Sequence, residues 1–68
     1  MDKSQKVKVY QWCRDNKDNS GAQYPKVLKM THYDYLSMKS NLRKRIPYAD
    51  YTIVVNEGNY KQLQFFIR

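Results

Sequence analysis

Residues 51–67 have the sequence YTIVVNEGNYKQLQFFI, which predicts a β-hairpin. Tyr51–Val55 is rich in β-branched residues and favours a strand. Asn56–Asn59 predicts a tight turn, so Tyr60–Ile67 is expected to be the partner strand. Because side chains alternate between the two faces of a strand, one face is apolar and the other is mixed. The apolar face consists of Leu63, Phe65 and Ile67, and the mixed face of Tyr60, Gln62, Gln64, Phe66 and Arg68.

One helix is predicted immediately before this hairpin. Thr31 and Asp34 have the spacing of a capping box, with Asp in the place of the usual Glu. Pro47 ends the helix at or just before Ile46. Between these ends, apolar residues recur at helical spacing and form one stripe along the helix. The stripe consists of Tyr35, Met38, Leu42 and Ile46.

Four cations gather toward the C-terminal end of the predicted helix: Lys39, Arg43, Lys44 and Arg45. Lys39 and Arg43 are one turn apart and therefore share a face. A run of charge on a helix is commonly a solvated face, and these cations also complement the helix dipole. The alternative is that they contact phosphate or an acidic partner, as the net charge of the chain suggests.

Two further strands are expected in the N-terminal half. Gln5–Arg14 contains an alternating run and predicts a first strand, with Val7, Val9 and Cys13 facing the core. Gln23–Met30 predicts a second strand, and turn-forming residues 15–21 would join the two as a hairpin. The opposite face of the first strand would carry Lys6, Lys8, Tyr10 and Trp12.

Together these elements predict an α+β fold with a small antiparallel sheet in β-β-α-β-β order and one helix packed on one face. The chain has 68 residues, so residues 1–68 are expected to form a single small basic binding domain. One helix covers only one face of the sheet. The other face must then meet water or a partner.

The charge of the chain favours polyanionic partners. Thirteen Lys and Arg residues against six Asp and Glu give a formal charge of +7, which suits nucleic acid or an acidic protein surface. No apolar run approaches the roughly 20 residues needed to span a bilayer, and the N-terminus lacks the apolar stretch of a secretory signal. We therefore expect a cytoplasmic protein that has no membrane partner.

The sequence argues against an enzyme. It has no glycine-rich phosphate loop, no metal-binding motif and no paired carboxylates. Cys13 is the only cysteine and is expected to be a small core residue, while His32 has no evident nucleophile beside it. We therefore expect no catalytic residue, no metal and no cofactor.

The leading hypothesis is a small non-enzymatic nucleic-acid-binding protein. The mixed faces of the first and last strands would stack bases, and the basic helix end would hold phosphate. Whether the ligand is DNA or RNA, and single or double stranded, stays open. Three alternatives also stay open: aromatic pairs that only stabilise the sheet, a homodimer that buries this face, and a phage-like or mobile-element accessory or inhibitor. Such an accessory would dock on a nucleic-acid-handling enzyme.

Overall fold

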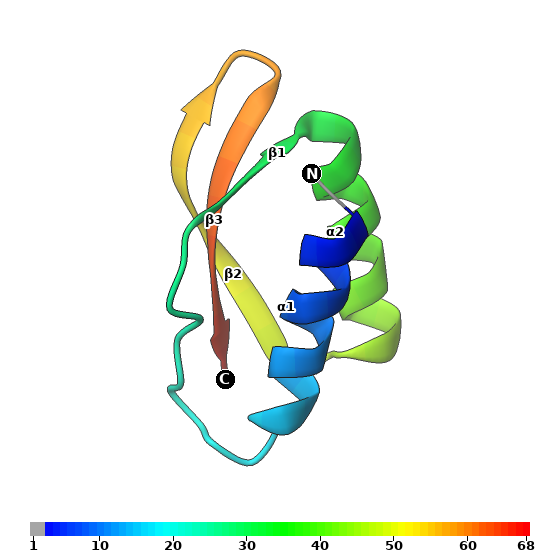
Figure 1. Cartoon of the computed structure of the whole chain (residues 1–68), viewed down its shortest axis with the longest axis vertical. Coiled ribbons are helices and arrows are strands. Elements are labelled where there is room, and N and C mark those ends of the chain that lie inside the picture. The colour runs from blue at the N-terminus through cyan, green and yellow to red at the C-terminus, as the bar shows by residue number, and fades with distance from the viewer. Residues whose placement is uncertain (1–2) are drawn as a thin grey trace.

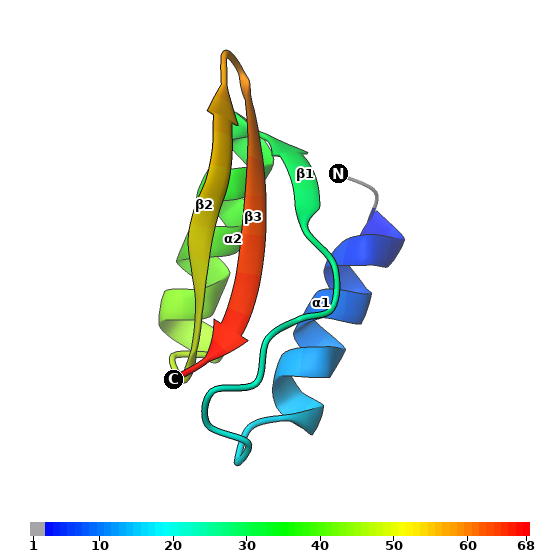
Figure 2. The same ribbon diagram turned by 90° about the vertical axis from the view of Figure 1, so that its left-hand side faces the viewer.

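The computed structural model describes residues 3–68, which form two helices and a three-stranded antiparallel sheet (Figure 1). The predicted α+β class is thereby confirmed. The central strand of the sheet is β3, flanked by β1 and β2. Both helices lie on the same face of the sheet, and no described helix covers the opposite face (Figure 2). The elements in chain order are α1 (Lys3–Asp15), β1 (Leu28–Thr31), α2 (His32–Arg45), β2 (Ala49–Glu57) and β3 (Tyr60–Ile67).

The first predicted strand, Gln5–Arg14, is wrong, because this segment forms helix α1. Val9 and Cys13 are four residues apart and both are fully buried, which is the periodicity of a helix face. Val7, which was expected in the core, is 56% exposed. Packing of one face stabilises a helix more than residue propensity does, so the β-favouring residues of this segment do not decide its structure.

The predicted element order is therefore corrected from β-β-α-β-β to α-β-α-β-β, and the predicted N-terminal hairpin does not exist. The second predicted strand, Gln23–Met30, is shortened to β1. Pro25 has no backbone N–H to donate to a ladder, and residues 25–27 leave the sheet. Before that proline, the Tyr24 N–H still donates to the Phe65 carbonyl at 2.7 Å, so the chain also lies beside the second half of β3.

Helix α2 begins and ends where the sequence predicts. The Thr31 hydroxyl accepts a hydrogen bond from the Asp34 N–H at 3.2 Å, and the helix ends at Arg45, two residues before Pro47. The predicted stripe faces inward: Met38, Leu42 and Ile46 are buried and Tyr35 packs beside them.

The hairpin of β2 and β3 is also confirmed, with β3 bounded as predicted and β2 longer than predicted. Gly58 adopts a positive φ of 56° in the turn, a conformation that glycine takes without steric cost. The apolar face of β3 lies against the helices, since Leu63, Phe65 and Ile67 are all buried. A β-bulge between Ile53 and Val55 interrupts the register of β2.

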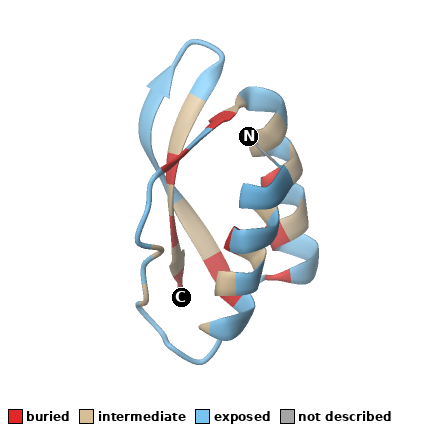
Figure 3. Cartoon of the chain, viewed as in Figure 1, coloured by how far each residue is buried: buried red, intermediate tan, exposed pale blue. Residues whose placement is uncertain are grey.

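The core lies between the sheet and the two helices (Figure 3). Every described element contributes to it, and the partly buried aromatics Trp12, Tyr24 and Tyr51 close its margins. No buried residue among those described is polar or charged. The core therefore consists of Val9, Cys13, Leu28, Met30, Met38, Leu42, Ile46, Ala49, Leu63, Phe65 and Ile67.

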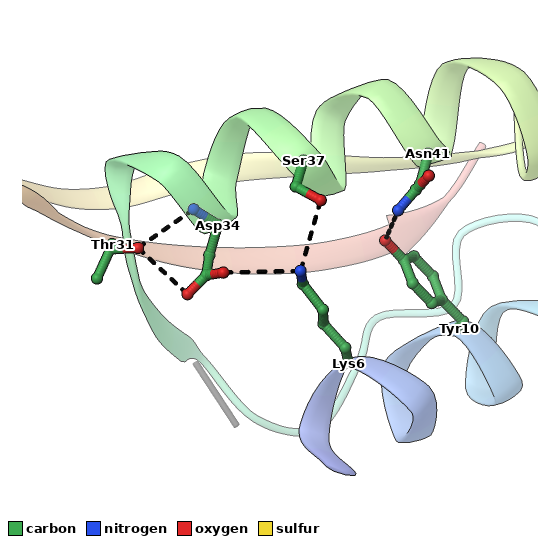
Figure 4. A network of polar contacts seen from close by, with 6 residues as sticks. All are labelled: Lys6, Tyr10, Thr31, Asp34, Ser37 and Asn41. Atoms are coloured by element: carbon green, nitrogen blue, oxygen red, sulfur yellow. Dashed lines mark hydrogen bonds and ion pairs between the residues drawn. The ribbon is translucent and has the colours of Figure 1, made fainter. Parts of the chain in front are cut away.

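Polar contacts join α1 to α2 alongside this core (Figure 4). The Lys6 ammonium lies 3.6 Å from Asp34 Oδ1 and 3.5 Å from Ser37 Oγ. One turn further along each helix, the Asn41 amide donates to the Tyr10 hydroxyl at 2.9 Å. On another side of α2, Leu36, Lys39, Ser40 and Arg43 are exposed to solvent.

Candidate anion-binding surface

The exposed side of α2 carries three cations, Lys39, Arg43 and Lys44, which we call the basic face of α2. All three are exposed, whereas Met38 and Leu42 on the same helix are buried. As predicted, Lys39 and Arg43 share a face, and with Lys44 they line one shallow depression on the helix surface. Across residues 3–68, none of these three side chains forms an ion pair. Their charges are therefore not neutralised within the described chain.

A second depression lies between α2 and the beginning of β2, and we call it the α2–β2 hollow. It has a volume of about 320 Å³ and is lined by Lys39 and Arg43 of the basic face together with Arg68 and Asp50. The Arg68 guanidinium Nη2 lies 3.2 Å from Asp50 Oδ2, and the Arg68 N–H donates to the Tyr48 carbonyl at 3.0 Å. Two segments far apart in the sequence thus place cations around one hollow.

Arg45 does not belong to the basic face, although the sequence groups it with the other three cations. It lines a small cavity of about 80 Å³ between the helices, together with Arg14 and Tyr10 of α1. Sequence reasoning missed Arg14, because alternation in a strand hides the four-residue spacing from Tyr10 to Arg14. The helical period would have placed these two residues on one face.

The predicted stacking residues of the first strand serve other roles on α1. Trp12 packs edge-to-face against Tyr24, with ring centroids 5.3 Å apart, and Tyr10 is half-buried against Asn41. Burial raises the pKa of the Tyr10 hydroxyl, and the hydrogen bond from Asn41 opposes that shift. Lys6 is engaged with α2, and Lys8 is exposed on α1. The four residues therefore do not form the sheet face that was expected.

Tyr60, Gln62, Gln64 and Phe66 of the mixed face do lie on the uncovered side of the sheet, because the apolar face of β3 is buried against the helices. Arg68, which was expected on the same face, follows β3 and instead lines the α2–β2 hollow. Tyr60 is 50% exposed, and Lys29 Nζ from β1 lies 5.0 Å from its ring centroid. Gln62, Gln64 and Phe66 are half-buried, and the Gln64 amide donates to the Tyr24 carbonyl. Lys29 is a second cation that sequence reasoning missed, because the pairing of Lys29 with Gln62 depends on the register of β1.

Three observations bear on other kinds of function. Within residues 3–68, no three His, Cys, Asp or Glu side chains are grouped to hold a metal ion. Burial raises the pKa of the Cys13 thiol to about 11, so this thiol stays protonated near neutral pH and is a poor nucleophile. None of the helices described is both long enough and apolar enough to span a bilayer.

Comparison with known proteins does not add to this description. No protein-family model, curated protein or solved structure matches the chain.

Proposed function

We propose that this protein is a small, non-enzymatic nucleic-acid-binding protein and that the basic face of α2 contacts the phosphate backbone. The observation that carries the proposal is the grouping of Lys39, Arg43 and Lys44 on one exposed helix side without ion pairs in the described chain. The formal charge of +7 supports it, because a strongly basic small domain attracts polyanions over its whole surface.

Helix α2 is well suited to hold these cations in place. It is capped by Thr31, packed on the core through Met38 and Leu42, and joined to α1 through Asp34 and Asn41. A rigid helix fixes the positions from which flexible lysine and arginine side chains reach out. Phosphate contacts of this kind give affinity and register on a nucleic acid but carry no base information.

The proposal keeps only a small part of the predicted base-stacking surface. Tyr10 and Trp12 pack within the structure, and on the uncovered sheet face Tyr60 is the most exposed of the predicted aromatics. We therefore assign binding mainly to charge, with Tyr60 beside Lys29 as a single position at which a base could stack. Single strands and duplexes are both expected to bind.

A second candidate function, a protein-binding accessory, is supported by β2. This strand is at the edge of the sheet, and Ile53, Val54 and Val55 are 38–53% exposed along it. No lysine or arginine occurs in residues 49–57. Lysines at a sheet edge commonly prevent another strand from pairing with it. A stoichiometric protein partner that survives nuclease treatment and is lost in Val54→Lys would favour this candidate.

A salt series tests the proposed nucleic-acid binding. The binding of a fluorescein-labelled single strand and of the matching duplex is measured by anisotropy between about 50 and 200 mM salt. Contacts from three cations predict a slope of log K against log salt of about −2.7 for the duplex and about −2.1 for the single strand. Affinity that does not change with salt would contradict the proposal.

A further inference from the structure

We infer that the α2–β2 hollow is a pocket for a single nucleotide unit, with its phosphate held by Lys39, Arg43 and Arg68. This inference rests on the proposed function and names what one part of the surface binds. The inference is based on the shape and lining of the hollow. The basic face of α2 and the net charge of the chain account for attraction to phosphate, but they do not account for a hollow with this lining.

The cations of the hollow converge from two separate parts of the chain. Lys39 and Arg43 are one turn apart on α2, while Arg68 follows β3 and is held there by its N–H bond to the Tyr48 carbonyl. Arginine presents a planar fork that matches phosphate oxygens in pairs, and lysine adds a point charge. A phosphate group among these three side chains would receive donors from two sides.

Apart from Asp50, the remaining lining of the hollow is apolar or aromatic. Leu42 and Ala49, both almost fully buried, form part of its wall, and Pro47 and Tyr51 complete it. The lining is thus divided equally between four charged residues and four that are apolar or aromatic. Small-molecule sites combine apolar walls with convergent charged groups, and about 320 Å³ lies at the small end of their range of volumes. Inorganic phosphate would leave the apolar part unfilled, whereas the sugar and base of a nucleotide would cover it.

The Asp50 carboxylate competes with a bound phosphate for the guanidinium of Arg68. Its Oδ2 pairs with Arg68 at 3.2 Å, and its Oδ1 accepts from the Tyr51 N–H at 2.8 Å. The carboxylate therefore holds Arg68 at the hollow and also repels an incoming anion. In the bound state, Arg68 turns from the carboxylate to the phosphate.

The test is a titration of the ¹⁵N-labelled protein with three probes: thymidine 5′-monophosphate, thymidine and inorganic phosphate. We expect the mononucleotide to shift the amide signals of residues 39–43, 49–51 and 68, with tighter binding than inorganic phosphate and no saturable shift from thymidine. Arg43→Gln and Arg68→Gln should each weaken mononucleotide binding about tenfold, since each removes a charged hydrogen bond. Lys26→Gln removes one charge from an exposed position outside the hollow and should change the affinity less than about twofold.

A parallel titration with a short oligonucleotide separates this inference from the proposed function. Oligonucleotide shifts on α2, with no mononucleotide shifts in the hollow, would overturn the pocket and leave nucleic-acid binding in place. Equal affinity for inorganic phosphate and mononucleotide would also overturn it. An oligonucleotide that causes no shifts at all would contradict both.

Discussion

Arg68 Nη2 lies 3.2 Å from Asp50 Oδ2, and both side chains line the hollow between α2 and β2. Both are solvent-exposed, with 65% of the Arg68 side chain and 40% of the Asp50 side chain accessible. An ion pair this exposed contributes at most about 1 kcal/mol to stability. The ion pair therefore contributes little to the stability of the fold, and in our proposal its importance is the charge that it leaves available to a ligand.

We expect Asp50→Asn to tighten oligonucleotide binding roughly threefold or more at low salt, because it removes a carboxylate that repels phosphate and occupies Arg68. The asparagine keeps an oxygen that can accept from the Tyr51 N–H. Anisotropy titration measures the affinity, and urea unfolding should show a change below about 1 kcal/mol. Weaker binding by a variant of unchanged stability would show that Asp50 does not compete with the ligand.

Trp12 is expected to matter for stability and not for binding. Because the ring is part-buried against Tyr24 and the core, Trp12→Ala should lower the free energy of unfolding by about 2–3 kcal/mol. Oligonucleotide affinity, measured where the variant is still folded, should stay within about twofold. Tyr33→Ala is the matched control, because Tyr33 is 80% exposed. A folded Trp12→Ala protein with strongly reduced affinity would restore the stacking hypothesis.

The cap of α2 is a separate determinant of stability. The Thr31 hydroxyl accepts from the Asp34 N–H, so Thr31→Ala should reduce the free energy of unfolding by about 0.5–2 kcal/mol. Ser40→Ala, at an exposed position of the same helix, should change stability by no more than about 0.5 kcal/mol. Thermal unfolding followed by circular dichroism compares the two. Equal melting temperatures would mean that the cap does not stabilise α2.

Stability is expected to fall in mildly alkaline solution. Burial raises the pKa of the Cys13 thiol from its ordinary value of 9.0 to about 11. The unfolded chain therefore releases this proton first, and the stability that is present below pH 9 is lost as the pH rises toward 11. Burial also raises the pKa of Tyr10 and of Tyr51, which acts in the same direction at higher pH.

Urea unfolding at pH 8 and pH 10 measures this loss, and Cys13→Ala provides the comparison. The variant has a lower stability at pH 8 because a buried side chain is shortened. Its decline between the two pH values should nevertheless be smaller than that of the original chain. Identical declines would mean that the thiol does not contribute.

The C-terminal half of the fold could be predicted from local signals. Thr31 and Asp34 mark the beginning of α2, Pro47 marks its end, and the alternation of Leu63, Phe65 and Ile67 marks the buried face of β3. Each signal depends on the backbone of its own segment, so no knowledge of the tertiary structure is needed. The placement of Lys39 and Arg43 on one face of the helix follows in the same way from the pitch of a helix.

The N-terminal half could not be predicted in the same way. Residues 6–13 fit a period of two, yet the burial of Val9 and Cys13 shows that the segment is a helix held by tertiary contacts. The position of Arg14 depends on the packing of α1, and that of Lys29 depends on the register of the sheet. The same long-range structure brings Arg68 next to α2. Long-range contacts therefore decide the part of the candidate site that the sequence missed.

The most direct test of the central claim compares two triple variants that have the same net charge. In one, the basic face of α2 is neutralised by Lys39→Gln, Arg43→Gln and Lys44→Gln. In the other, Lys3, Lys17 and Lys26, which are exposed elsewhere, are replaced by glutamine. If the basic face holds the phosphates, the first variant loses at least about a hundredfold in duplex affinity at about 50 mM salt, and the second loses less than about tenfold. Equal losses would contradict the claim, because binding would then depend on net charge alone.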